Sequence, residues 1–318
     1  MIRRFLALFE PFILILLGTV LLATLLPAGG VWATVFSGAA DAGIVLLFFL
    51  HGARLSRQAI VDGARNWRLH LAVLGTTFVL FPLLGLGVAA LPWAGPAAAG
   101  LLFLTLLPST VQSSIAFTAI ARGNVAAAVC SASFSNLLGI LLTPLLVALL
   151  MHSAGGISLA SIETIVSQLL VPFVAGHLLR PWIGGIVARH KSALSLVDRG
   201  SILLVVYSAF GAAVVEGLWH RLSPGDLALV FAFCTVMLGV VLAATWALGR
   251  LIGLPPEDAI VLQFCGSKKS LASGVPMAGV LFPAAQVGVV LLPLMLFHQL
   301  QLIACAVIAK RYAARAGE

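Results

Sequence analysis

The fold is decided by a polar stretch inside an apolar segment, Gln263-Phe264-Cys265-Gly266-Ser267-Lys268-Lys269-Ser270. A charge at the centre of a bilayer costs at least about 2.5–3.5 kcal/mol on insertion scales, so lysines at such a place are rare and usually functional. A similar stretch lies earlier in the chain, Leu107-Pro108-Ser109-Thr110-Val111-Gln112-Ser113-Ser114. Helices that break at membrane depth are tolerated only where their backbone is buried in protein or lines a cavity. The two stretches therefore predict a binding site.

The composition places the chain in a membrane. Of its 318 residues, 61% are hydrophobic and only 9% are charged, whereas soluble proteins carry about 25% charged residues. A soluble fold of this length could not bury so much apolar surface, so the lipid bilayer is the expected partner. The four cysteines lie in apolar runs without the Cys or His spacing of a zinc site. We expect no metal and no other cofactor.

Segments of about 20 apolar residues can cross the hydrocarbon core, and the sequence contains ten. They extend over about 8–27, 33–53, 69–91, 97–121, 124–151, 160–182, 199–219, 225–252, 257–282 and 286–309. Most connections are short, as at 92–96, 154–156 and 283–285. The longest, near 183–198, is expected to include a short interfacial helix.

The basic residues predict the orientation of these spans. All 18 Lys and Arg residues except Arg221, Lys268 and Lys269 fall on the side that holds both termini. Because cytoplasmic loops are rich in basic residues, both termini are predicted to be cytoplasmic, at the inner membrane if the source is bacterial. The cations are spread over several loops beside the spans, so the net charge of +8 gives no reason to expect nucleic acid as a partner. Nothing in the sequence specifies an oligomeric state.

Ten spans divide into two sets of five, and a repeat with an odd number of spans makes the second copy run in the opposite direction. This is the inverted-repeat plan of many secondary transporters. The two polar stretches lie in the fourth and ninth spans, which are equivalent positions in the two sets. The predicted fold is an all-α integral membrane protein with ten transmembrane helices, of which the fourth and ninth are broken.

Lys268 and Lys269 are the first candidate site residues. Adjacent ammonium groups repel unless one is neutral or each has a partner, and no Asp or Glu lies in the middle of the fourth, fifth, ninth or tenth span. Burial disfavours the charged form of an amine, so one lysine could carry a proton. A fixed ammonium could instead replace a bound cation, or either lysine could bind an anionic substrate. Without a function, both side chains would reach towards an interface.

The other candidates are polar side chains in otherwise apolar spans. At a helix break such groups can coordinate a cation or hydrogen-bond a substrate, although Ser and Thr also join membrane helices to one another. A histidine in a span can relay protons or be purely structural. The candidates are Ser109, Thr110, Gln112, Ser113, Ser114, Gln263, Ser267 and Ser270 on the broken spans, and Asn136, His298, Gln299 and Gln301 on the spans expected to face them.

Four segments resemble the bile acid:sodium symporter family, and in particular the branch that includes the vertebrate sodium/bile acid cotransporter 7 and its bacterial relatives. They are Pro108–Ser114, Ala121–Ala126, Leu142–Pro144 and Phe264–Ala272. The resemblance implies two inverted repeats arranged as a core domain (about 69–151 and 225–309) and a panel domain (about 1–53 and 160–219). It also implies that spans four and nine are unwound where they cross, and that substrate binds between core and panel.

Most sodium ligands of that family are replaced in this chain. The resemblance implies two sodium ions at the crossing, bound by side chains of spans three, four, five and nine. Ser114 matches one ligand, and the other positions carry Thr77, Ile115, Ala128, Ala132, Gln263 and Ser267. Two positive charges also arrive nearby, and Coulomb repulsion opposes a bound cation. We therefore expect that this protein does not use the two-sodium mechanism.

The sequence favours a secondary transporter that moves an organic anion by alternating access, with a lysine in the coupling role and a proton in place of sodium. Sodium-coupled symport of a bile acid or another organic anion is one alternative. A regulatory membrane protein that kept the fold and lost transport is a second. An intramembrane enzyme with Ser267 or Ser270 beside a basic lysine is a third, but no acid or oxyanion-hole motif accompanies these residues.

Overall fold

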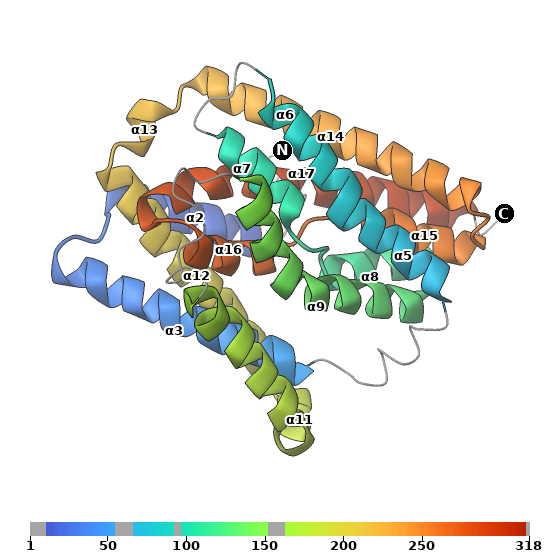
Figure 1. Ribbon diagram of the computed structural model, residues 1–318, viewed down its shortest axis with the longest axis horizontal. Coiled ribbons are helices and arrows are strands. Elements are labelled where there is room, and N and C mark those ends of the chain that lie inside the picture. Colours follow the sequence, from blue (N-terminus) through green and yellow to red (C-terminus); the bar gives the residue numbers. More distant parts are fainter. Residues whose placement is uncertain (1–10, 55–65, 92–96, 152–162, 316–318) are drawn as a thin grey trace. The chain divides into compact units, whose positions relative to one another are not determined.

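The computed structural model describes residues 11–54, 66–91, 97–151 and 163–315 (Figure 1). Within these ranges the chain forms helices joined by turns and has no strand, as the all-α prediction requires. Some sequence predictions fall outside the described residues. They are the basic residues Arg3, Arg4, Arg57 and Arg65 and the connections at 92–96 and 154–156.

Most of the described chain lies in α-helices, and two short π-helices adjoin them. In chain order they are α2 (Pro11–Leu25), α3 (Val31–Arg54), α5 (Trp67–Gly75), the π-helix η2 (Thr76–Leu80), α6 (Phe81–Ala89), α7 (Ala98–Leu106), α8 (Gln112–Ile120), α9 (Val125–Leu150), the π-helix η3 (Val166–Leu170), α11 (Val171–Arg189), α12 (Lys191–Val215), α13 (Leu218–Arg221), α14 (Pro224–Leu251), α15 (Pro256–Gly266), α16 (Leu271–Leu281) and α17 (Ala284–Arg315).

Seven helices in the described part of the chain are long and apolar enough to cross a membrane. They extend over 31–54, 67–89, 125–150, 163–189, 191–215, 224–251 and 284–314. The other three predicted spans correspond to shorter helices: α2 has 15 residues, and the segments 97–121 and 257–282 each form two helices with a non-helical stretch between them. Large apolar side chains such as Leu21, Trp182 and Val236 are more than half exposed, as expected for surfaces that face lipid.

The predicted long connection near 183–198 is wrong. Helix α11 continues to Arg189 and α12 begins at Lys191, so two long helices meet there at a single residue. The prediction ended the spans where the apolar residues ended. Helical hydrogen bonds continue past that point, because a charged residue outside the hydrocarbon core can still extend a helix.

The chain forms two compact units. The first contains 1–55, 152–223 and 274–291, and the second contains 56–151, 224–273 and 292–318. The division into panel and core domains stays a prediction, and residues 274–291, which it placed in the core, belong to the first unit.

In the first unit, α3 packs against α11 through two glycines (Figure 1). A Cβ atom on Gly52 would overlap the carbonyl oxygen of Phe173, and a Cβ atom on Gly176 would overlap that of Phe49. Small residues allow membrane helices to approach this closely. At the end of α3, the Arg54 guanidinium forms an ion pair with Asp198 of α12.

In the second unit, a polar cluster joins the beginnings of α5, α9 and α15. Asp258 is buried, and its two carboxylate oxygens accept hydrogen bonds from Asn66 Nδ2 at 2.6 Å and Asn124 Nδ2 at 2.9 Å. The Asn124 side chain also caps α9 by accepting a hydrogen bond from the Ala127 amide at 3.0 Å. One asparagine therefore caps its own helix and links it to α15.

Replacing Asn124 by alanine is expected to lower the free energy of unfolding by about 2 kcal/mol, because it removes a cap and a hydrogen bond to a buried carboxylate. Thermal unfolding in detergent measures this loss. Asn124→Ser keeps a capping oxygen and loses the bond to Asp258, so its stability should lie between those of Asn124→Ala and the parent. Equal losses in the two variants would show that the cap contributes nothing.

Candidate functional site

The chain leaves the helical conformation between α7 and α8, and the backbone carbonyls of this first break find donors in other segments. Thr143 Oγ1 donates to the Leu106 carbonyl at 2.7 Å. The Ser270 amide donates to the Pro108 carbonyl at 2.9 Å, and Asn136 Nδ2 donates to the Ser109 carbonyl at 2.8 Å. The Lys269 side chain donates to the carbonyls of Thr105 and Leu107. The break is thus held by side chains and backbone of distant segments, as a buried backbone requires.

The second break, between α15 and α16, is satisfied in the same way. Ser109 Oγ donates to the Cys265 carbonyl at 2.5 Å, and Ser114 Oγ donates to the Phe264 carbonyl at 3.0 Å. At the end of α15, Ser267 Oγ donates to the Gln263 carbonyl at 2.5 Å. Each break therefore supplies hydrogen-bond partners for the other, which brings the two predicted polar stretches together.

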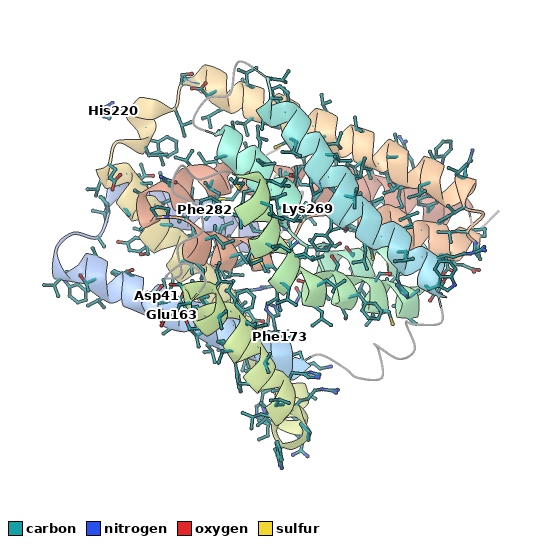
Figure 2. All side chains as sticks on the ribbon, viewed as in Figure 1. Asp41, Glu163, Phe173, His220, Lys269 and Phe282 are labelled. Carbon is teal, nitrogen blue, oxygen red and sulfur yellow. The ribbon has the colours of Figure 1, made fainter. Side chains whose placement is uncertain are left out.

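Lys269, whose position Figure 2 labels, is fully buried and has a complete set of partners. Its Nζ atom donates to three backbone carbonyls: those of Thr77 at 2.8 Å, Thr105 at 2.7 Å and Leu107 at 2.7 Å. The Phe81 ring centroid lies 4.2 Å from Nζ, which adds a cation–π contact. The Lys269 side chain thus lies in a polar nest within an apolar unit.

The backbone of Lys269 is also fixed. Its amide donates to Gln301 Oε1 at 2.9 Å, and Gln301 Nε2 donates to the Lys269 carbonyl at 2.9 Å. Gln301 Nε2 lies 2.8 Å from His298 Nδ1, so the two predicted residues of α17 form one network. The structure places His298 beside the Gln301 amide group.

Lys268 is equally buried but has few partners. Within the described residues, its Nζ atom makes one long hydrogen bond, to Ser113 Oγ at 3.4 Å. It also lies 4.0 Å from the Phe117 ring centroid. Neither lysine forms an ion pair with a carboxylate in the part of the chain that the structure describes. Lys268 is therefore a buried cation with unused donor capacity.

A chain of hydroxyl groups begins at Lys268. Ser113 Oγ donates to Thr110 Oγ1 at 2.8 Å, Thr110 Oγ1 lies 2.8 Å from Ser114 Oγ, and Ser114 Oγ donates to the Phe264 carbonyl. Because Ser114 uses its proton on that carbonyl, Thr110 must donate to Ser114, and all three hydroxyls point away from the lysine. The lysine is then the donor that starts the chain.

The other predicted residues differ in how many of their side-chain polar atoms form hydrogen bonds. Asn136 donates to the Ser109 carbonyl and accepts from Ser273 Oγ at 2.8 Å, and Ser270 Oγ bonds to Ser273 Oγ at 3.0 Å. Among the predicted site residues, four buried side-chain atoms have no hydrogen-bond partner within the described part of the chain. They are Thr77 Oγ1, Gln263 Oε1 and both amide atoms of Gln299. Gln112 is exposed and begins α8. A binding role for all these residues stays a prediction.

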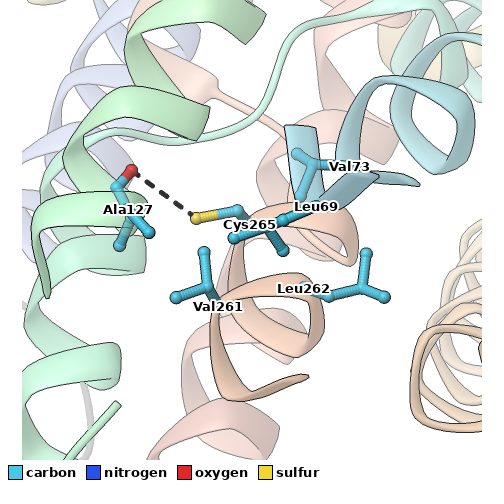
Figure 3. Packing of buried hydrophobic residues seen from close by; sticks show 7 residues of the cluster. Leu69, Val73, Ala127, Val261, Leu262 and Cys265 are labelled. Atoms are coloured by element: carbon cyan, nitrogen blue, oxygen red, sulfur yellow. Dashed lines mark hydrogen bonds between the residues drawn. The ribbon is translucent and has the colours of Figure 1, made fainter. Parts of the chain in front are cut away.

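Ala128 belongs to a buried apolar cluster, which Figure 3 shows from close by. Its neighbours form a buried cluster whose members are Leu69, Val73, Ala127, Ala128, Val261, Leu262 and Cys265. None of these side chains has an oxygen atom, and the Cys265 thiol donates to the Ala128 carbonyl at 3.8 Å. The surroundings therefore do not favour a sodium ion beside Ala128.

Sequence reasoning missed the carbonyls that bind Lys269. Two prolines carry the signal that could have revealed them. Pro82 has no amide hydrogen, and Phe81 donates to Thr76, so neither can donate to the Thr77 carbonyl. Pro108 follows Leu107, where the backbone becomes extended and α7 ends. Prolines at these two places release carbonyl groups that a distant donor must then satisfy.

The chain is similar to known membrane transport proteins. It matches the family model of the SBF-like CPA transporters over residues 10–314. It is 58% identical over 311 residues to an uncharacterized protein of Pseudomonas aeruginosa, covering 96% of this chain and 93% of that protein. It is 52% identical over 311 residues to the candidate symporter YfeH of Escherichia coli, covering 95% and 92%. It is 26% identical over 264 residues to sodium/bile acid cotransporter 7-A of Xenopus laevis, covering 81% and 77%.

Proposed function

The chain belongs to the SBF-like CPA transporter family, and on that premise we propose that it moves an organic anion across the membrane by alternating access, coupled to protons and without bound sodium. Family membership confirms the resemblance to the bile acid:sodium symporters and indicates a multi-pass membrane transporter for a small molecule rather than an enzyme. The substrate class and the coupling ion belong to the proposal.

The proposed architecture has ten spans in two inverted five-helix repeats, with both termini cytoplasmic. In this arrangement α7 and α8 together form the fourth span, and α15 and α16 form the ninth. Two observations support it. The two pairs of short helices hold equivalent places in the two sets of five spans. Their breaks are joined by the hydrogen bond from the Ser270 amide to the Pro108 carbonyl. Broken helices of this kind carry the binding sites of many secondary transporters.

The observation that carries the proposal is the incomplete coordination of Lys268. A buried ammonium with one long hydrogen bond and contacts to the Phe117 and Phe264 rings recovers only part of its lost hydration. A substrate carboxylate or other anion would supply that compensation when the site opens. Release of the proton after the anion has left would remove the poorly compensated charge. Binding and release of anion and proton would thus be linked at one nitrogen atom.

The hydroxyl chain from Ser113 to Ser114 supports a proton as the coupling ion. Each hydroxyl donates one hydrogen bond and accepts one, so the chain keeps a lone pair of Ser113 Oγ directed at Lys268 Nζ when that nitrogen carries a proton. The apolar cluster around Ala128 supports the absence of sodium, since it leaves a ligand position of the sodium-coupled relatives without oxygen. Transport would then depend on pH and on Lys268, and not on sodium.

The test is transport by the purified protein in liposomes that contain a pH-sensitive dye. Adding a transported anion outside should acidify the lumen, at equal rates in sodium and potassium buffers. Lys268→Ala should abolish this acidification. Acidification that requires sodium would overturn the proposed coupling, and anion uptake by Lys268→Ala at the parental rate would remove Lys268 from the site.

Thr110→Val is expected to slow anion-dependent acidification, because it removes the middle hydroxyl of the chain while nearly keeping side-chain shape. Its stability should fall by only about 1–2 kcal/mol, the cost of leaving neighbouring hydroxyls without a partner. Thr110→Ser restores the hydroxyl and should restore the rate. If Thr110→Val and Thr110→Ser acidify the lumen equally fast, the hydroxyl chain has no part in proton coupling.

A further inference from the structure

The carbonyl groups around Lys269 form a three-sided nest of oxygen atoms. The nest consists of the carbonyl oxygens of Thr77, Thr105 and Leu107, all within 2.8 Å of Nζ. Their usual helical donors are engaged elsewhere or absent. The Ser109 amide, which would donate to Thr105 in a continuous helix, donates instead to Ser135 Oγ at 2.9 Å, and the Phe81 amide donates to Thr76.

The geometry of the nest fits a cation. Three acceptors match the three N–H groups of an ammonium, whereas a neutral amine has only two hydrogens to donate. The Phe81 ring lies against the same nitrogen, and such a contact favours positive charge. Backbone carbonyl oxygens in this kind of arrangement also replace the hydration shell of monovalent metal ions in selective channels.

We propose that the nest is a binding site for a monovalent cation, and that Lys269 fills it permanently with its own ammonium group. The ammonium group of Lys269, which is attached through its side chain, thus takes the place of a free cation in the nest. A tethered ammonium does not dissociate, so no ion gradient can act through this site. Lys268, which lacks such a nest, keeps the freedom to exchange a proton or an anion. Cation binding at the nest does not depend on which substrate the protein moves.

The nest should accept a free cation once the tether is removed. Lys269→Ala deletes the atoms from Cγ to Nζ, and n-propylammonium restores the same atoms. The melting temperature of detergent-purified Lys269→Ala should rise saturably with n-propylammonium and recover at least half of the loss caused by the substitution. Tetramethylammonium, which has a charge but no N–H group, should not have this effect.

Lys268→Ala is the matched control, because its side chain is equally buried and has no carbonyl nest. It should gain no more from n-propylammonium than the parent protein does. An equal gain in Lys268→Ala and Lys269→Ala, or no gain in Lys269→Ala, would overturn the proposal.

The parent protein gives an independent test that does not require the variant to fold. Its melting temperature should be the same in sodium, potassium and choline chloride at equal ionic strength, because the nest is already occupied. Specific stabilisation of the parent by sodium or potassium would contradict the proposal. Both readouts are thermal, so a failure here is distinct from a failure to transport an anion.

Discussion

Replacing Lys269 by methionine is expected to destabilise the protein by at least about 3 kcal/mol, whereas Lys268→Met should leave its stability nearly unchanged. Methionine keeps most of the length of the side chain and removes the ammonium. In Lys269→Met three buried carbonyls lose their donor, and each buried polar group without a partner costs about 1–3 kcal/mol. Relief from burying a charge offsets part of this cost.

For Lys268→Met the favourable and unfavourable contributions to the free energy of unfolding nearly cancel. It loses one hydrogen bond of 3.4 Å and the cation–π contacts with Phe117 and Phe264, and it removes a poorly compensated charge from an apolar environment. Thermal unfolding in detergent separates the two cases, since 3 kcal/mol corresponds to a shift of about 6–12 °C for a domain of 150–250 residues. Equal shifts in melting temperature, or a larger shift in Lys268→Met, would show that Lys269 is not the more strongly coordinated of the two lysines.

Replacing Gly52 or Gly176 by alanine is expected to push α3 away from α11 and to lower the free energy of unfolding of the first unit by at least about 2 kcal/mol. The added Cβ atom would overlap a backbone carbonyl oxygen of the facing helix, at Phe173 or Phe49 respectively. A flexible side chain could move aside, but a helical backbone cannot move without shifting the whole helix. Overpacking of this kind costs about 3 kcal/mol or more, against a gain of about 1 kcal/mol in helix propensity.

The matched control is Gly38→Ala, which lies in the same helix α3. A Cβ atom at Gly38 meets no atom within 4 Å, so this variant should gain the propensity term without a clash. The yield of monodisperse protein after size-exclusion chromatography compares the three variants. Folding of Gly52→Ala and Gly176→Ala at the level of Gly38→Ala would show that the two helices are not in such close contact.

Several features of the molecule follow from local composition, and these were accessible from the sequence. Runs of apolar residues predict helices and a membrane because hydropathy adds up along a segment. For the same reason a proline with several hydroxyl residues, as between Leu107 and Ser114, predicts a break. The errors lie at helix ends, as between α11 and α12, where charged residues ended the apolar span but did not end the helix.

Hydropathy and the positions of the polar residues indicate a helical membrane protein with two polar breaks and two lysines within its spans. Which of the two lysines is coordinated depends on the tertiary structure. Lys268 and Lys269 are chemically identical neighbours, and their difference arises from carbonyl groups more than 160 residues away along the chain. Hydropathy is a property of neighbouring residues, whereas a hydrogen bond depends on which distant groups lie within about 3 Å. The carbonyls that η2 and α7 bring to one nitrogen atom therefore assign the two lysines their separate roles.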